Sequence, residues 1–393
     1  MRTEGDHIKI REYLLPFSWI YGAGVWIRNQ MFDLGILKSQ AYNIPVISVG
    51  NITVGGSGKT PHVEYLIRLL KDKVKVAVLS RGYKRKTKGY LLADANTTMP
   101  QVGDEPYQMK SKFDDIYVAV DRKRTRGIEN LTTHEETKDV DVILLDDAFQ
   151  HRYVKPGISI LLVDYHRLII YDKLLPAGCL RESKEGKSRA DIVIITKCPK
   201  DLKPMEFRVL TKAIDLYAYQ SLFFTTLQYD NLKKVFSQEE KSLKEIKKTD
   251  NILLITGIAS SEQMVADLKH HSKNITHLNF GDHHQFTDKD IKQINKAFEQ
   301  MPHPKLIITT EKDATRLGHL DKLSDEVKNN LYELPIRIQF MLNQEEDFNN
   351  KIISYVHKNS RNSILAKRKN DNKSQNSHHS GNRTRTISFR DNR

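Results

Sequence analysis

A glycine-rich loop holds the residue types and spacing best suited to chemistry in this chain. Residues 55–60 read Gly-Gly-Ser-Gly-Lys-Thr and lie between an apolar β-branched run at 46–49 and a helical pattern from Pro61 onward. Strand, glycine loop and helix in this order predict a P-loop, whose backbone N–H groups surround nucleotide phosphates. We expect Lys59 to reach the β- and γ-phosphates and Thr60 to ligate Mg²⁺ through its hydroxyl. The predicted nucleotide-binding residues are Thr53, Val54, Gly55, Gly56, Ser57, Gly58, Lys59 and Thr60.

This loop departs from the general P-loop pattern at one position. The pattern G-x-x-x-x-G-K-[ST] begins with glycine, whereas this chain has Thr53 there. A chance glycine-rich turn is the alternative interpretation. The intact GGSGKT core between a strand and a helix favours a nucleotide site.

Two acidic pairs supply the carboxylates that phosphoryl transfer requires. Asp146 and Asp147 follow the apolar run 142–145, where a P-loop protein positions the carboxylate that holds its metal. The second pair, Asp104 and Glu105, lies in a predicted turn. We expect Asp104 to accept the proton of an alcohol acceptor as a general base; a surface turn without chemistry is the alternative. The predicted metal ligands are Thr60, Asp146, Asp147 and Glu105.

Two adjacent histidines lie in another predicted loop, at 281–286 (Gly-Asp-His-His-Gln-Phe). No further ligand at zinc spacing accompanies them, so they do not indicate a zinc site. Taken alone, His283 and His284 are best explained as surface residues.

The N-terminal region contains an uncharged run at 13–27 that is rich in aromatic residues. As a helix it would be roughly 22 Å long, which is short of the ~30 Å hydrocarbon layer of a bilayer. Trp19, Tyr21 and Trp26 are of types that favour the headgroup boundary. We therefore expect a helix that lies in the membrane interface rather than crossing it. A buried core helix is the alternative.

Short apolar runs alternate with helical stretches over the rest of the chain, which is the pattern of a parallel sheet covered on both faces. We predict an α/β fold with a P-loop NTPase-like, mostly parallel sheet, a smaller C-terminal α/β domain and the N-terminal membrane-associated helix. The last strand and helix of the smaller domain are predicted at 335–340 and 348–356. The predicted domains are 1–38 (membrane-associated region), 39–220 (P-loop kinase domain), 221–358 (smaller α/β domain contributing to the active site) and 359–393 (basic disordered tail).

Charge is distributed unevenly along the chain. The formal net charge is +14, and residues 361–393 supply half of it, with nine Lys or Arg against two Asp. Two further basic clusters, at 81–88 and 122–126, favour anionic partners such as phosphorylated ligands or an anionic membrane surface. The chain has two cysteines without paired spacing, and the N-terminus lacks the features of a signal peptide. We expect a reducing compartment.

With these residues assembled, the chain resembles the tetraacyldisaccharide 4′-kinase family, the lipid A 4′-kinases of Gram-negative bacteria. The resemblance covers about residues 10–350, and Thr53 fits it because the family's loop also begins with threonine. Cys179 departs from the family pattern, at a place that does not touch the chemistry. The motifs that carry the resemblance are SVGNITVGGSGKTP, LSRGY, VGDEP, DDAFQHR, LLPAGCLRE, TGIA, GDHHQF and TTEKDATRL.

The resemblance implies transfer of the γ-phosphoryl group of ATP, with Mg²⁺, to the 4′-hydroxyl of a tetraacyldisaccharide 1-phosphate, giving lipid IVA. It implies a peripheral or monotopic enzyme at the cytoplasmic face of the bacterial inner membrane. The family pairs the carboxylate of Asp104 with His283 or His284, and we favour His283, so the predicted catalytic residues are Asp104, His283 and Lys59. The predicted substrate-binding residues are Arg81, Tyr83, Arg122 and Arg181.

The expected partners are the lipid A disaccharide 1-phosphate precursor and an anionic membrane surface, with no nucleic acid and no obligate protein partner. A P-loop GTPase would carry a guanine-reading [NT]-K-x-D motif, but residues 196–199 (Thr-Lys-Cys-Pro) lack the aspartate and residues 310–313 (Thr-Glu-Lys-Asp) have the wrong spacing. A nucleic-acid-binding protein would use the basic clusters, but the sequence contains no recognised reading module. The acidic partners of the loop favour a kinase.

Overall fold

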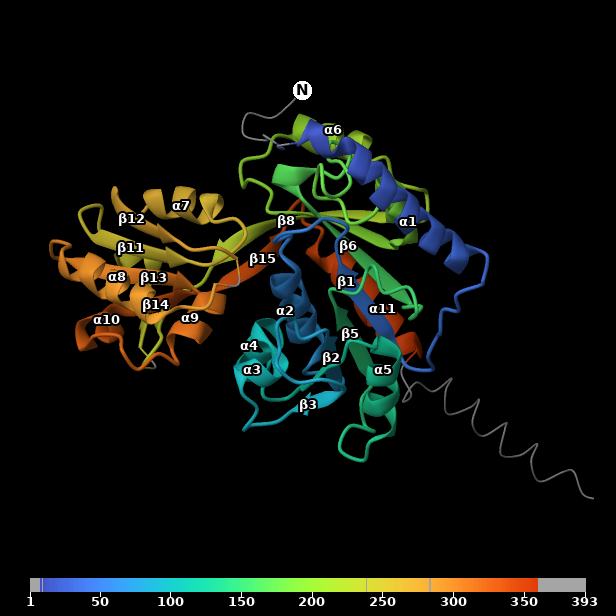
Figure 1. The fold of residues 1–393 in the computed structure, drawn as a ribbon, viewed down its shortest axis with the longest axis horizontal. Helices are drawn as coiled ribbons and strands as arrows, with labels where there is room; N and C mark the ends of the chain where they lie inside the picture. The colour runs from blue at the N-terminus through green and yellow to red at the C-terminus, as the bar shows by residue number, and fades with distance from the viewer. Residues whose placement is uncertain (1–7, 9, 238, 283, 360–393) are drawn as a thin grey trace, which may run out of the picture.

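Two β-sheets organise the described part of the chain (Figure 1). The computed structural model describes residues 8, 10–237, 239–282 and 284–359. His283 and residues 360–393, which make up nearly all of the predicted tail, lie outside the described residues. Within the described ranges the larger sheet has nine strands and the smaller sheet has six.

The larger sheet is parallel except at its edges, where β15 and β3 pair in antiparallel fashion with their neighbours. In spatial order its strands are β15 (Ile336–Phe340), β8 (Ser221–Tyr229), β7 (Ile192–Thr196), β6 (Ile158–Asp164), β1 (Val46–Gly50), β5 (Val142–Asp146), β2 (Val76–Ser80), β4 (Tyr117–Val120) and β3 (Leu91–Ala93).

Alternate residues of the central strands enter hydrophobic cores on opposite faces of this sheet. In β5, Val142 and Leu144 join the core that α2 and α11 share, whereas Ile143 and Leu145 join the core that α5 shares. Burial on both faces explains why these strands read as continuous apolar runs. The prediction of a mostly parallel sheet covered by helices is confirmed. The helices of this unit are α1 (Leu15–Asp33), α2 (Lys59–Leu70), α3 (Met99–Val102), α4 (Asp104–Lys112), α5 (Arg124–Thr133), α6 (Pro204–Ile214) and α11 (Glu345–Asn359), with 3-10 turns η1 (Glu12–Leu14), η2 (Tyr165–Arg167) and η3 (Lys184–Arg189).

The smaller sheet forms a second unit with its own cores on its two faces. Figure 1 shows it to one side of the larger unit, connected to it by β8 and β15. In spatial order its strands are β10 (Glu240–Lys241), β9 (Leu232–Lys234), β14 (Leu331–Leu334), β13 (Lys305–Thr310), β11 (Asn251–Thr256) and β12 (Asn274–Asn279). Its helices are α7 (Glu262–Lys269), α8 (Asp288–Glu299), α9 (Glu311–Leu317) and α10 (Asp325–Asn330), with the 3-10 turn η4 (Leu243–Glu245).

The end of the described chain returns to the larger unit, which corrects one sequence-based prediction. The strand at 335–340 was expected in the smaller domain, but β15 pairs with β8 of the larger sheet. The helix at 348–356 was expected there too, but α11 buries Phe348, Ile352 and Val356 in the core of the larger sheet. Their spacing of four residues forms a stripe on one helix face. This stripe explains why α11 packs against the larger sheet.

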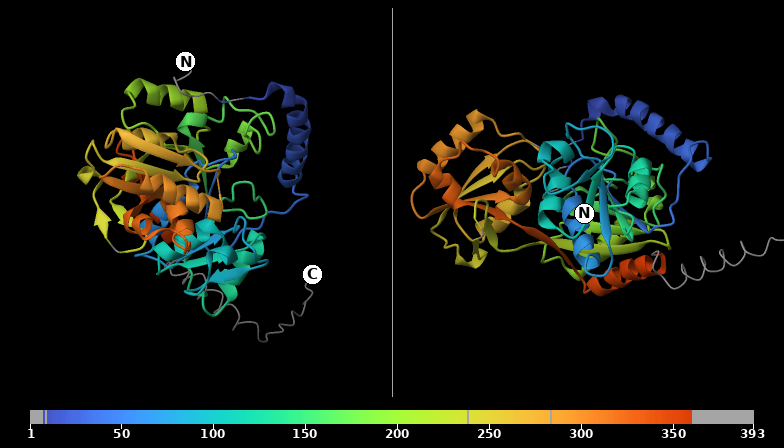
Figure 2. Two further views of the ribbon diagram at one scale, coloured as in Figure 1. Left: turned by 60° about the vertical axis from the view of Figure 1, so that its left-hand side comes forward. Right: turned by 90° about the horizontal axis from the view of Figure 1, so that it is seen from below.

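The predicted N-terminal helix is present as α1, and it is not the buried core helix that was the alternative. Only Ser18 and Phe32 of its residues are buried, and Trp19 and Ile20 are each 73% exposed. Both views of Figure 2 show α1 along an outer flank of the larger unit. Among the described residues, no helix combines the length and apolar character needed to cross a membrane. The other large apolar side chains exposed in and beside this helix are Tyr13, Phe17, Trp26, Ile27, Leu34 and Ile36.

The packing of α11 predicts that the protein loses stability when a side chain of its apolar stripe is truncated. Phe348→Ala removes a ring that packs 4.6 Å from Phe340, centroid to centroid, and 5.3 Å from Phe223. We expect a loss of about 3–5 kcal/mol in the free energy of unfolding, measured by denaturant titration. His357→Ala, on the exposed face of the same helix, should change stability by less than about 0.5 kcal/mol. Equal effects of the two changes would contradict the docking.

Candidate active site

The glycine loop connects β1 to α2 at the carboxyl end of the larger sheet. Gly55 and Gly58 have φ angles of 107° and 82°, in the region that disfavours side chains. Because α2 begins at Lys59, the unpaired amides of its first turn lie at the loop. Thr53 is buried, and its hydroxyl accepts a hydrogen bond from Asn51 Nδ2 at 3.3 Å. The loop therefore has the local geometry of a phosphate cradle.

A cavity of about 940 Å³ lies between the two units and brings most of the predicted residues together. The smaller unit contributes Ile258, Ala259, Asp282 and Lys312 to its walls. Among the predicted residues, Asp104, Asp146 and Thr53 are absent from its lining, and His283 lies outside the described residues. The predicted residues that do line it are Val54, Gly55, Gly56, Ser57, Gly58, Lys59, Thr60, Arg81, Tyr83, Glu105, Arg122, Asp147 and Arg181.

Lys59 and Arg181 share the carboxylate of Asp147. Lys59 Nζ lies 3.6 Å from Asp147 Oδ1, and Arg181 Nη1 lies 3.3 Å from Asp147 Oδ2. Burial of Asp147 opposes its ionisation, but these two cations outweigh burial and lower its pKa. Asp147 also adopts a φ of 46°, which is uncommon for a residue with a side chain. It is therefore held as a charged group beside the P-loop lysine.

The pKa of Asp146 is shifted in the opposite direction. Its side chain is buried, and burial together with the charges of Glu105 and Asp147 raises its pKa to about 7. Ser80 Oγ donates a hydrogen bond to Asp146 Oδ2 at 3.1 Å. Within the described residues, the buried Oδ1 of Asp146 has no hydrogen-bond partner. A buried carboxylate with an unsatisfied oxygen is suited to bind a cation.

These groups fit a Mg²⁺ ion that is held together with a nucleotide. In the described ranges, no group of three or more His, Cys, Asp or Glu side chains is arranged to hold a metal by itself. Mg²⁺ is usually bound by one or two carboxylates, with phosphate and water oxygens completing its shell. The hydroxyl of Thr60, which lines the cavity, matches that donor set. The unsatisfied Oδ1 of Asp146, which is buried, matches it as well.

Asp104 begins α4 rather than lying in a turn, which corrects the local prediction. It follows Gly103, whose φ of 94° and whose closeness to the carbonyl oxygen of Tyr83 leave no room for a Cβ atom. Arg316 of α9 forms an ion pair with Asp104, and Lys312 Nζ lies 3.5 Å from Glu105 Oε1. The smaller unit thus contacts both acidic residues at the start of α4.

The two predicted histidines differ in what the structure says of them. His284 Nε2 lies 2.9 Å from Asp290 Oδ2, and its ring stacks on Phe280 at 4.9 Å between centroids. Asp290 is itself part of the capping box at the start of α8. His284 is therefore engaged in the local structure of the smaller unit. His283 lies outside the described residues.

Helix α1 contacts the cavity as well as presenting its aromatic face to the outside. Tyr21, Val25, Arg28 and Asn29 line the cavity. The Tyr21 hydroxyl donates to the carbonyl oxygen of Arg181 at 2.8 Å, and Arg28 Nη2 donates to that of Gln150 at 3.2 Å. The helix is thus fixed to segments that carry predicted site residues.

Several charged residues of the site carried no predicted role. Arg124 is buried and donates to the carbonyl oxygen of Asp146 at 2.9 Å, and burial lowers the pKa of Arg124 to about 10. Lys197 Nζ contacts the carbonyl oxygen of Gly56 and lies 2.6 Å from Asp164 Oδ2. Lys197 was considered only as part of a guanine-reading motif, and Arg124 only as part of a basic cluster. Their partners are distant in sequence, so local patterns gave no signal.

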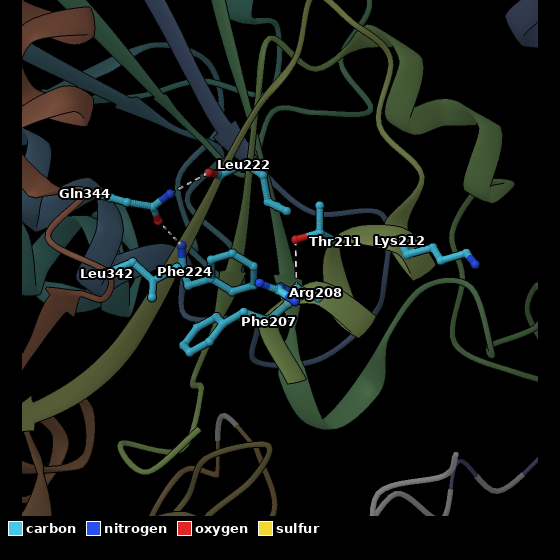
Figure 3. A pocket seen from close by; sticks show the side chains of 8 residues that line it. All are labelled: Phe207, Arg208, Thr211, Lys212, Leu222, Phe224, Leu342 and Gln344. Atoms are coloured by element: carbon cyan, nitrogen blue, oxygen red, sulfur yellow. Dashed lines mark hydrogen bonds between the residues drawn. The ribbon is translucent and has the colours of Figure 1, made fainter. Parts of the chain in front are cut away.

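A second, shallower pocket of about 500 Å³ lies against α6 and the segment after β15 (Figure 3). Its wall is formed by Phe207, Leu222, Phe224 and Leu342, and Figure 3 shows Lys212 pointing away from these side chains. Gln344 fastens the segment by hydrogen bonds to the backbone of β8 at 3.3 Å. Its lining contains no carboxylate, no histidine and no part of the glycine loop, so we place the chemistry in the larger cavity.

Comparison with known proteins identifies the family of the chain. Residues 10–357 match the family described as LpxK, tetraacyldisaccharide-1-P 4′-kinase. The chain is 58% identical to the tetraacyldisaccharide 4′-kinase of Phocaeicola vulgatus over 362 residues, which cover 92% of this chain and 99% of that protein. The corresponding protein of Bacteroides fragilis is 52% identical over 376 residues, covering 94% of this chain and 100% of that protein.

A solved structure supports the same relationship. A crystal structure of LpxK from Aquifex aeolicus in complex with ATP superposes with a TM-score of 0.66 at 30% sequence identity, covering 88% of this chain and 99% of that chain. The matched region includes the P-loop, both acidic pairs and the smaller unit. The chain therefore belongs to the LpxK family of tetraacyldisaccharide-1-P 4′-kinases.

Proposed function

We propose that this kinase transfers the γ-phosphoryl group of ATP to the 4′-hydroxyl of tetraacyldisaccharide 1-phosphate, giving lipid IVA, and that the cavity between its two units is the site of transfer. Membership of the family makes the chain an ATP-dependent kinase of the lipid A precursor. The observation that carries the site assignment is that one cavity is lined by the P-loop, by Glu105 next to the proposed base, and by α1.

The larger unit supplies the nucleotide site in this proposal. Backbone amides of the glycine loop and of the first turn of α2 bind the phosphates, and Lys59 stabilises the charge that moves onto the transferred group. Asp146, Asp147, Thr60 and Glu105 are the candidate holders of Mg²⁺. The ion, when bound, neutralises phosphate charge and draws the β- and γ-phosphates into one orientation.

Asp104 is the proposed general base, assisted by His283. As the 4′-oxygen attacks the γ-phosphorus, the bond from phosphorus to the bridging oxygen of ADP breaks, and the hydroxyl proton passes to the carboxylate. Arg316 forms an ion pair with Asp104 and so holds this carboxylate in place at the start of α4. Absence of Asp104 from the cavity wall does not oppose the role, since catalytic contacts often tighten only when substrates bind.

Four residues are the proposed contacts for the phosphorylated sugar. Arg81, Tyr83, Arg122 and Arg181 all line the cavity, and three of them are cations. Guanidinium groups bind phosphate through paired N–H donors, which suits the 1-phosphate of the acceptor.

The outer face of α1 is the proposed membrane contact, at the cytoplasmic face of the inner membrane. Its exposed aromatic residues include Trp19 and Trp26, and its other side meets the cavity through Tyr21 and Val25. Aromatic side chains favour the boundary between headgroups and acyl chains. This arrangement would let an acyl chain remain in lipid while the sugar reaches the nucleotide.

The phosphate cradle predicts that one lysine is essential. Lys59→Ala should reduce transfer of labelled phosphate from ATP to purified disaccharide 1-phosphate by about 10²-fold or more, since a charge stabiliser in a closed site contributes at least that much. Lys73→Ala, on the exposed surface just after α2, is the matched control and should leave the rate unchanged. A Lys59→Ala enzyme with wild-type turnover would refute the P-loop assignment.

The two acidic residues at the start of α4 should separate by phenotype. Asp104→Asn should lower kcat by roughly 10²–10⁴-fold and leave the Kd of ATP unchanged, because a general base contributes to transfer and not to nucleotide binding. Glu105→Gln should instead raise the Mg²⁺ concentration needed for half-maximal rate. Loss of ATP binding in Asp104→Asn would make that residue a metal ligand in place of a base.

The exposed face of α1 predicts a loss of membrane binding when it becomes polar. The double change Trp19→Ser and Ile20→Ser should move the protein from the floating to the soluble fraction in vesicle flotation with anionic lipid, without changing its unfolding temperature. The matched control is Tyr217→Ser with Tyr219→Ser, because both tyrosines are exposed on another part of the larger unit. Equal flotation of all three proteins would remove the membrane role from α1.

A further inference from the structure

Lys112, the last residue of α4, lies between two carboxylates from different elements. Its Nζ is 2.7 Å from Glu64 Oε2, and it also forms an ion pair with Glu311. The Glu64 side chain is 1% exposed and that of Glu311 is 12% exposed. Glu64 belongs to α2, the helix that follows the P-loop, whereas Glu311 begins α9 of the smaller unit. One ammonium group therefore links three helices in two units.

Each carboxylate has a second attachment. Glu64 accepts a hydrogen bond from Gln108 Nε2 of α4 at 3.0 Å, so it meets α4 at two positions. Glu311 Oε2 accepts a hydrogen bond from the backbone N–H of Ile336 at 3.2 Å. Ile336 is the first residue of β15, the strand by which the chain returns to the larger sheet. The cluster of Lys112, Glu64 and Glu311 is thus attached to the P-loop helix and to the connection between the units.

Helices α4 and α9 also carry the contacts of Asp104, the proposed base. Helix α4 begins with Asp104 and ends with Lys112, and α9 pairs with it through Arg316 at the start and through Glu311 at the end. Lys312 adds a contact of 3.5 Å to Glu105. Each of these pairs joins opposite charges, so the position of α4 relative to α9 is defined at both ends of α4. Lys112 is the member of this series that also reaches α2.

Charge balance makes Lys112 the central member of the cluster. Burial and the negative charge of Glu64 raise the pKa of Glu311, and burial together with Glu311 raises the pKa of Glu333 to about 7. Without the ammonium group, Glu64 and Glu311 would repel one another, and the C-terminal end of α4 would lose its ion pairs with α2 and α9, whereas Gln108 would still join α4 to α2 and Arg316 would still join it to α9.

We propose that Lys112 is a positioning residue for phosphoryl transfer: by bridging Glu64 and Glu311 it fixes α4 against the P-loop helix and α9, and so holds Asp104 at the bound nucleotide. This inference rests on the proposed role of Asp104 as the base. Lys112 is not among the residues that line the cavity, and it lies about 12 Å along α4 from Asp104 at 1.5 Å per residue, so we assign it no contact with either substrate.

The test compares turnover with nucleotide binding in the full-length protein. Lys112→Met should lower kcat by about 10- to 100-fold, the effect of a small misplacement of a catalytic group, while the Kd of ATP stays within twofold. Lys112→Arg should recover most of the rate, because it retains the charge. Lys110→Met, two residues earlier on α4, is the matched control and should behave as wild type. A loss of ATP affinity in Lys112→Met as large as its loss of kcat, or a wild-type kcat in that variant, would overturn the proposal.

Two further variants keep the test decisive. Glu311→Gln retains the pair between Lys112 and Glu64 and removes the charge that Glu311 offers to Lys112, while its amide oxygen can still accept from the backbone of Ile336. It therefore tests the proposal if Lys112→Met fails to fold, and its kcat should fall with an unchanged unfolding temperature. In an Asp104→Asn background, Glu311→Gln should give no further loss in a single-turnover assay with labelled ATP. A further loss as large as in the wild-type background would overturn the proposal. A wild-type rate for Asp104→Asn itself would instead refute the role of Asp104.

Discussion

The parallel pairing of β1 with β5 is the constraint on which the site depends. Parallel strands end at the same edge of a sheet, so the pairing Val49↔Asp146 brings the start of the glycine loop beside the acidic pair. The charged side chains around this edge interact with that acidic pair. Lys59 and Arg181 neutralise Asp147, whereas Asp146 keeps an unsatisfied oxygen in the interior. The larger sheet therefore presents a phosphate cradle and a cation-binding carboxylate within one edge.

The smaller unit contacts the start and the end of α4 through charged side chains. Arg316 and Lys312 meet Asp104 and Glu105, and Glu311 meets Lys112. Partly buried ion pairs of this kind contribute less to stability than to the choice of one arrangement over others, because desolvation offsets much of their attraction. The contact between α4 and α9 is best understood in that way. It determines how the two units are oriented more than how tightly they adhere.

Local sequence predicted the parts of the site whose partners are close in the chain. The glycine loop, the acidic pair at the end of β5 and the apolar helix at the N-terminus each carry their pattern within a few residues. The fold class followed in the same way from alternating runs. Asp104 was misplaced locally, because Gly-Asp-Glu-Pro is typical of a turn, although proline is also tolerated in the first turn of a helix. A helix beginning at Asp104 was therefore compatible with the same residues.

Contacts between distant residues were beyond these patterns. Lys112 meets Glu64 and Glu311 across 48 and 199 residues, and nothing in its neighbourhood distinguishes it from a surface lysine. The assignment of β15 and α11 failed for the same reason, since an apolar strand shows that it is buried but not in which sheet. Tyr83 and Arg181, by contrast, were assigned through the family resemblance, and the structure places both at the cavity.

The antiparallel pairing of β8 with β15 limits how the two units can move. Its register runs from Ile336↔Tyr229 to Phe340↔Thr225, and Ile338 and Phe340 are buried in the larger core. Sliding by one residue would turn those side chains to the opposite face, so the two strands can bend or twist together but cannot slip past one another. The point at which the chain passes between the two units is consequently fixed by these buried side chains. The register therefore fixes where the connection leaves the larger sheet, whereas the ion pairs between α4 and α9 set how the smaller unit lies against it.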